Sequence, residues 1–93
     1  MKPSELIADP KAWTKGVAAV NATGKEVGPS SNEAVAWCLY GACVRCGVWD
    51  DQRADRLGEL IRKNIGTGTV TDFNDDPNRT HTEVIAILKE AGL

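Results

Sequence analysis

The fold is decided by the stretch Ser31–Cys46, whose sequence is SNEAVAWCLYGACVRC. At its start, Ser30 and Glu33 have the spacing of a capping box, in which each side chain accepts a hydrogen bond from the other residue's backbone amide. Arg45 is the only charged residue in the stretch after Glu33, and a helix that is apolar nearly all round belongs in a core. We therefore predict a buried central helix over this stretch. Gly41 costs such a helix about 1 kcal/mol relative to alanine, which indicates the close approach of another element.

Two amphipathic helices are predicted to follow. Asp50 or Asp51 caps the first of them, which runs to about Asn64. Its expected apolar face consists of Ala54, Leu57, Leu60, Ile61 and Ile65. Thr80 and Glu83 form a second capping box at the start of the last helix. The Gly-Leu pair that follows this helix has the residue types of a Schellman ending.

The remaining segments are predicted to supply a small sheet. Trp13–Val27 is typical of a β-hairpin, with β-branched residues on either side of a turn at Asn21–Gly24. Thr69–Thr71 is expected to add an edge strand after a flexible joint at Gly66–Gly68. The predicted fold class is α+β and mostly helical: a buried central helix, two or three amphipathic helices and a small antiparallel β-hairpin, in a single domain over residues 1–93.

Composition disfavours several classes of partner. The formal net charge is −2, whereas nucleic-acid binders usually carry a basic patch, so we expect no nucleic acid. No apolar run reaches the roughly 20 residues that a membrane span requires, so we expect no membrane partner. The early residues lack the apolar core of a signal peptide, and the three cysteines are an odd number. A cytoplasmic protein is the expectation.

The cysteines are the first candidates for chemistry. Cys38, Cys43 and Cys46 have the opening spacing of plant-type [2Fe–2S] ligands, but a fourth cysteine is absent. The favoured interpretation is that they are small core residues, which free cysteines commonly are. Zinc binding together with His81, and a thiol nucleophile with His81 as its base, stay as alternatives. We therefore expect no cofactor, no metal and no catalytic residue.

An acidic stretch, residues 72–83, is the second candidate. Asp72, Asn74, Asp76 and Glu83 occupy positions 1, 3, 5 and 12 of an EF-hand-like calcium loop. Pro77 stands where that loop needs a glycine for its sharp turn, and proline cannot replace it. The favoured interpretation is a polar turn before a helix. Small-ligand or metal binding by this loop remains the alternative.

Four short motifs suggest a relationship: Trp13 with Gly16, Trp37-Cys38 with Gly41-Ala42, Phe73-Asn74-Asp75, and Arg79-Thr80-x-x-Glu83-Val84-Ile85. The chain resembles a small family of uncharacterised bacterial and phage domains of unknown function. The resemblance extends from Trp13 to Ala91, and its most specific part is the Phe-Asn-Asp loop that leads into the Arg-Thr helix start. The chain departs from the pattern at Cys43 and Cys46 and in its longer Gly-Thr-Gly joint. The resemblance implies a phage or mobile-element setting.

We therefore expect a non-enzymatic domain that binds another protein. The resemblance implies an accessory protein that inhibits or modulates a host protein such as a defence complex. The candidate binding surface combines Trp49, because exposed tryptophans often anchor interfaces, with Phe73, Asn74, Asp75 and Arg79. The purely structural alternative is that Arg79 pairs with Asp75 and that Asn74 shapes the turn. The identity of the partner, the oligomeric state and the strand order stay open.

Overall fold

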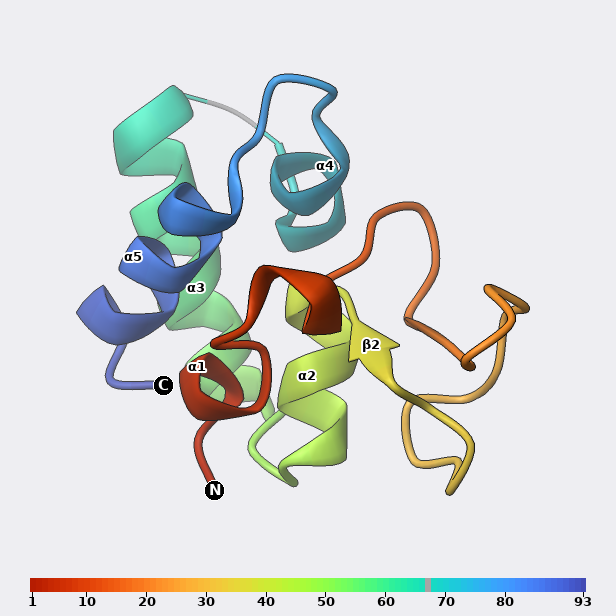
Figure 1. Ribbon diagram of the computed structural model, residues 1–93. Coiled ribbons are helices and arrows are strands. Elements are labelled where there is room, and N and C mark those ends of the chain that lie inside the picture. Colours follow the sequence, from red (N-terminus) through yellow and green to blue (C-terminus); the bar gives the residue numbers. More distant parts are fainter. Residues whose placement is uncertain (67) are drawn as a thin grey trace.

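The computed structural model describes residues 1–66 and 68–93 and is mostly helical, with a small antiparallel sheet (Figure 1). The elements follow in the order α1 (Pro3–Leu6), η1 (Pro10–Ala12), β1 (Ala19–Val20), β2 (Ala36–Trp37), α2 (Leu39–Arg45), α3 (Asp51–Ile65), α4 (Val70–Asp75) and α5 (His81–Glu90). The predicted α+β class with a dominant helical part is confirmed. Thr67, in the middle of the predicted Gly-Thr-Gly joint, lies outside the described residues.

The longest helix, α3, forms as predicted. Asp50 is its N-cap and accepts a hydrogen bond from the Arg53 amide at 2.8 Å. At the other end Gly66 adopts a left-handed φ of 84°, which side chains disfavour and glycine allows. Three apolar residues of α3 are buried, namely Leu57, Leu60 and Ile61. Ile65, which was predicted to share that buried face, is instead 40% exposed because it stands in the last turn of the helix.

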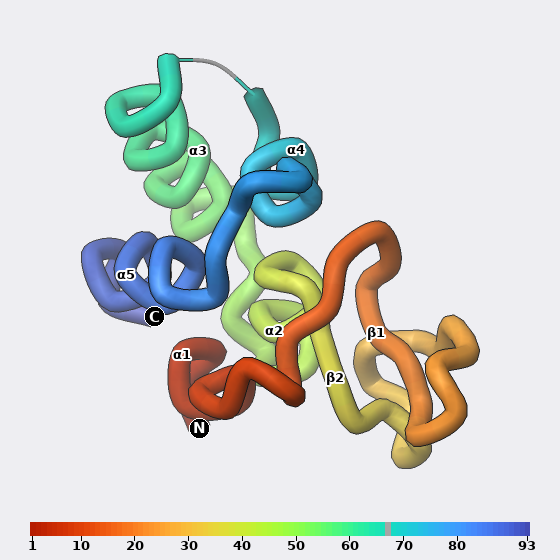
Figure 2. The backbone as a smooth tube through the Cα atoms, turned by 45° about the horizontal axis from the view of Figure 1, so that its top comes forward, coloured from red at the N-terminus to blue at the C-terminus, as the bar shows by residue number. Residues whose placement is uncertain are grey.

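The last helix, α5, begins and ends as predicted. Thr80 and Glu83 form the expected capping box. The Leu93 amide donates to the Leu88 carbonyl oxygen at 2.8 Å, and the Gly92 amide donates to that of Lys89 at 3.0 Å, which is the Schellman pattern. α1 packs against α2 and α5, and α3 packs against α4 and α5, so the helices enclose one core (Figures 1 and 2).

The central helix, α2, begins eight residues later than predicted, at Leu39 instead of Ser31. The predicted Ser30–Glu33 capping box is wrong, because the Glu33 amide donates to the hydroxyl of Ser31 in a short turn. The residues that precede α2 are extended and form β2, which pairs with β1. Cys38 is the true N-cap, and its Sγ accepts from the Gly41 amide at 3.2 Å. Backbone pairing between distant segments therefore prevails over a local helical pattern.

The close approach predicted at Gly41 is confirmed. A Cβ built on Gly41 would lie 1.9 Å from the backbone oxygen of Ala18, a separation that no real Cβ tolerates. The glycine thus lets α2 rest directly on the backbone that enters β1. The helix is buried through Leu39, Ala42 and Cys43, so the central position of α2 in the core is as expected although its length is not.

The predicted hairpin forms only in part, and β1 makes a second pairing that was not predicted. The turn at Asn21–Gly24 forms, with the Gly24 amide donating to the Asn21 carbonyl oxygen at 2.9 Å. The returning segment makes a bridge between Val20 and Glu26, and the Val27 amide donates to the Ala19 carbonyl oxygen at 3.1 Å. β1 also pairs with β2, with Ala19 opposite Trp37. The arm formed by residues 20–34 extends away from the helices in both views (Figures 1 and 2).

The edge strand predicted at Thr69–Thr71 is also wrong. Thr69 is the N-cap of α4, and Thr69 and Asp72 form a further capping box. This box outweighs the β-branched composition of the segment, because it supplies partners for two backbone amides at a helix start. Among the residues that the structure describes, no helix has the length and apolar character needed to cross a membrane.

Candidate functional site

Asn74 links three distant parts of the chain. Its side chain is fully buried on α4. Oδ1 accepts hydrogen bonds from Trp13 Nε1 at 2.7 Å and from the Leu39 amide at 3.0 Å. Nδ2 donates to the Thr14 carbonyl oxygen at 3.1 Å and to Asp75 Oδ1 at 2.9 Å. The amide thereby uses both its donors and both its acceptor positions inside the protein.

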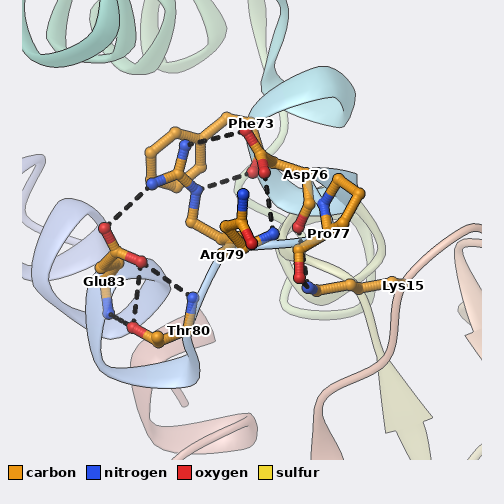
Figure 3. A network of polar contacts seen from close by, with 8 residues as sticks. Lys15, Phe73, Asp76, Pro77, Arg79, Thr80 and Glu83 are labelled. Atoms are coloured by element: carbon orange, nitrogen blue, oxygen red, sulfur yellow. Dashed lines mark hydrogen bonds and ion pairs between the residues drawn. The ribbon is translucent and has the colours of Figure 1, made fainter.

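The side chains of Asp75 and Arg79 also form their polar contacts within the protein. Asp75 Oδ1 also accepts from the Gly16 amide at 2.9 Å. The Arg79 guanidinium lies over the Phe73 ring at 3.9 Å from its centroid, and Nε donates to the Phe73 carbonyl at 2.9 Å. Arg79 Nη1 binds Glu83 Oε2 at 3.0 Å (Figure 3). The expected alternative pair of Arg79 with Asp75 is therefore replaced by one with Glu83, one turn into α5.

A lysine from the N-terminal segment also contacts this region. We call the region the α4–α5 corner and define it as residues 73–83 together with Lys15. Lys15 Nζ donates to the Asp76 carbonyl oxygen at 2.8 Å, beyond the end of α4 (Figure 3). It also lies 5.3 Å from the centroid of the Trp13 ring. Cations near a helix C-terminus satisfy carbonyl groups that have no partner in the helix. The corner is therefore a fastening between α4, α5 and the N-terminal segment.

Four residues of the predicted binding surface lie in the α4–α5 corner. The structure brings Phe73, Asn74, Asp75 and Arg79 together, as the prediction required, but it directs them inward. Phe73 is 3% exposed and Asn74 is not exposed at all, so both side chains face the core of the protein. Trp49 does not belong to this cluster.

The calcium-loop alternative does not fit the backbone. Asp72 and Asn74 lie within α4, where Asp72 caps the helix. Glu83 accepts from the Thr80 amide at 2.9 Å as the cap of α5, and this hydrogen bond is the main reason that its pKa is lowered. Within residues 1–66 and 68–93, no group of three or more His, Cys, Asp or Glu side chains is arranged to hold a metal ion.

The thiols lack the environment of a nucleophile. Cys38 and Cys43 are buried, and burial raises the pKa of Cys43 to about 12. Burial also raises the pKa of Cys38 and of Cys46. A reactive cysteine needs the opposite shift, because the thiolate is the nucleophile. His81 packs beside Trp13 and hydrogen-bonds through Nε2 to the Ile7 carbonyl at 2.6 Å. The geometry thus gives no support to a thiol-dependent enzyme.

A hollow lies where α3 faces the start of α4. We call it the aromatic groove; its volume is about 380 Å³, and its walls include Tyr40, Trp49, Asp55, Gly58, Arg62 and Val70. Tyr40 and Trp49 meet edge to face, with ring centroids 4.9 Å apart and an interplanar angle of 85°. Tyr40 is 36% exposed. A second hollow, of about 240 Å³, is lined in part by the paired side chains of Arg79 and Glu83.

The three tryptophans differ in what their indole N–H groups bind. Trp13 Nε1 donates to Asn74, and Trp37 Nε1 donates to the Pro29 carbonyl oxygen at 2.9 Å. Trp49 Nε1 has no acceptor among the described residues. Every buried side-chain polar atom of those residues does have a hydrogen-bond partner. The N–H of Trp49 therefore reaches the protein surface. Tyr40 is itself exposed, and its hydroxyl forms no hydrogen bond with the described residues.

A glycine shapes the floor of the groove. A Cβ built on Gly58 would lie 3.3 Å from Arg62 Nη1, so the missing side chain lets the guanidinium rest against α3. Arg62 takes part in none of the ion pairs found among the described residues. Tyr40, Gly58 and Arg62 were missed by the sequence prediction. The available signal was the glycine in mid-helix, one turn before an arginine.

No curated protein and no solved structure matches the chain. A family model does, and it covers residues 3–92, which is nearly the whole sequence. Its description is a family of unknown function, in agreement with the predicted membership of an uncharacterised domain family. The chain belongs to DUF6197, a family of unknown function.

Proposed function

We propose that this chain is a non-enzymatic domain that binds another protein through the aromatic groove. The observation that carries the proposal is Trp49, whose indole N–H is open while those of the other two tryptophans are used internally. Tryptophan, tyrosine and arginine are the residue types that most often anchor protein interfaces. All three types line this one groove.

The finer part of the proposal concerns the partner. Resemblance to phage and bacterial domains suggests an accessory protein that modulates a host protein, for example a component of a defence complex. The proposed binding surface keeps Trp49 from the predicted set and adds Tyr40 and Arg62. It leaves out the four residues that are engaged within the α4–α5 corner, namely Phe73, Asn74, Asp75 and Arg79.

The test compares capture of partners by the wild-type chain and by Trp49→Ala from a lysate of the organism that encodes it. Val35→Ala is the matched control, because Val35 is a large apolar residue that is 49% exposed and does not line the groove. Truncation of an anchor costs at least about 2 kcal/mol, or roughly thirtyfold in affinity. We expect that loss for Trp49→Ala with the purified partner, measured by calorimetry, and none for Val35→Ala.

Circular dichroism and the melting temperature establish that both variants are folded. Equal affinity of wild type and Trp49→Ala for every captured protein would contradict the proposal, as would a lysate from which the wild type retains nothing.

A further inference from the structure

We infer that the occupant of the aromatic groove is an extended peptide segment that contains proline and carries a carboxylate side chain next to Arg62. The inference deepens the proposed function and rests on it. It follows from the hydrogen-bonding capacity, the shape and the charge of the groove.

The groove offers donors that have no acceptor among the described residues. These are the N–H of Trp49, the hydroxyl of Tyr40 and the guanidinium of Arg62. A ligand that complements them must present free acceptors. A polyproline II segment does so, because its backbone makes no internal hydrogen bonds and its carbonyl oxygens point outward. Proline also brings no backbone N–H that would need an acceptor from the groove.

The shape of the groove agrees with such a ligand. Two rings that meet at 85° present flat apolar walls to the hollow beside them, and aromatic-lined grooves are the usual docking sites of proline-rich segments. A volume of about 380 Å³ is near the lower end of the 300–1,000 Å³ typical of ligand sites. It accommodates a few side chains of an extended strand and is small for the whole apolar face of a helix.

Charge decides which end of the groove takes the acidic side chain. Arg62 lies flat against Gly58 and holds a planar fork that suits a carboxylate. Asp55 lines the same groove two turns earlier on α3 and forms no ion pair with Arg62. A carboxylate is therefore favoured at the Arg62 end and repelled at the Asp55 end, so the acidic residue must lie to one side of the prolines.

The experiment is a selection from a displayed random-peptide library on immobilised protein. We compare wild type with Arg62→Glu and with the matched control Arg56→Glu, which makes the same charge change on an exposed residue of α3 outside the groove. Wild type and Arg56→Glu are expected to enrich peptides with proline and with Asp or Glu. Arg62→Glu is expected to enrich Lys or Arg at the acidic position instead.

One selected peptide is then synthesised with a fluorescent label and titrated with each protein. We expect Arg62→Glu to weaken its binding at least tenfold and Trp49→Ala to do the same, with Arg56→Glu close to wild type. Enriched peptides with apolar residues at helical spacing would overturn the inference. The same holds for peptides whose acidic residue is dispensable, and for a library that yields no binder.

These outcomes separate the inference from the function on which it rests. A native partner that is lost on Trp49→Ala, together with selected peptides that lack proline and acid, refutes the ligand class and leaves protein binding standing. Partner capture that is unaffected by Trp49→Ala refutes the proposed function itself.

Discussion

The α4–α5 corner and the aromatic groove lie at opposite ends of α4, and each combines an arginine with aromatic side chains. In the corner, Arg79 lies on Phe73, binds its carbonyl oxygen and pairs with Glu83, so its side chain is only 9% exposed. In the groove, Arg62 rests on Gly58 with no carboxylate partner among the described residues. Similar residue types thus serve the fold at one end and remain available to a ligand at the other.

The difference shows where function is to be sought in a small domain. The corner contains the more conspicuous sequence motif, yet its polar groups stabilise contacts between segments that are about 60 residues apart, such as Trp13 with Asn74. The groove has no motif, and it is distinguished only by donors that lack an internal partner. Buried polar groups in native proteins are nearly always hydrogen-bonded, so open donors on apolar walls are the more informative signal.

The largest effect is expected from Asn74→Ala, which would break the corner. The change leaves Trp13 Nε1 and the Leu39 amide without their acceptor. Each unsatisfied buried donor costs about 1–3 kcal/mol, so we expect the free energy of unfolding in urea to fall by about 3 kcal/mol or more. Asn78→Ala is the control, because Asn78 is exposed, and it should stay within about 0.5 kcal/mol of wild type. A loss below about 1 kcal/mol for Asn74→Ala would show that the corner does not depend on this amide.

A pair of glycine substitutions sharpens the comparison with an intermediate effect. In Gly41→Ala the new methyl group meets the backbone oxygen of Ala18 at 1.9 Å, and such overpacking costs about 1–3 kcal/mol. In Gly58→Ala the nearest atom belongs to the movable end of Arg62, at 3.3 Å. Alanine favours a helix by up to about 1 kcal/mol over glycine, so Gly58→Ala should be neutral or stabilising in thermal and urea unfolding. Destabilisation of both variants to the same degree would mean that the groove is as tightly packed as the core.

The smallest effect concerns the acid dependence of the corner. Hydrogen bonds from Thr80, and then the charge of Arg79, hold the pKa of Glu83 below its ordinary value of 4.5. A lowered pKa in the folded state means that the carboxylate stabilises the protein above the ordinary pKa, and that this contribution disappears as the pH falls through the folded value. Wild type should therefore exceed Glu83→Gln in stability at neutral pH, and the gap should close on acidification from about pH 5.

Urea unfolding at a series of pH values measures this gap, and Glu90→Gln on the same helix is its control. A gap for Glu83→Gln that stays constant down to pH 3 would show that the capping carboxylate contributes no charge-dependent stability.

The start of α3 and both ends of α5 were the parts of the fold that sequence could predict. Their hydrogen bonds join residues that are only a few positions apart, so a local sequence pattern is sufficient to find them. The examples are Asp50, the Thr80–Glu83 box and the Gly92-Leu93 ending. The close approach of another element at Gly41 was also predictable. A glycine in a helix lowers the stability of that helix, which suggests that a neighbouring element occupies the space of the missing side chain.

Contacts between distant segments explain what was missed. The stretch before Cys38 has a helical pattern, but part of it forms β2 and pairs with β1. No local sequence signal indicates that pairing. The Thr69 box was overlooked because it uses Asp72 in place of Glu or Gln. For the candidate site, the sequence identified Trp49 but not Tyr40 or Arg62, since a groove exists only after α3 and α4 have packed together.

The side-chain amide of Asn74 uses all of its hydrogen-bonding positions, and this has a consequence for comparing relatives. Aspartate would lose both of its donors, and glutamine would displace them by a methylene group, so no other residue reproduces its four hydrogen bonds. The Phe-Asn-Asp motif is then a marker of common architecture. A relative with the same motif is expected to have the same fastening, whatever residues stand at positions 40, 49 and 62.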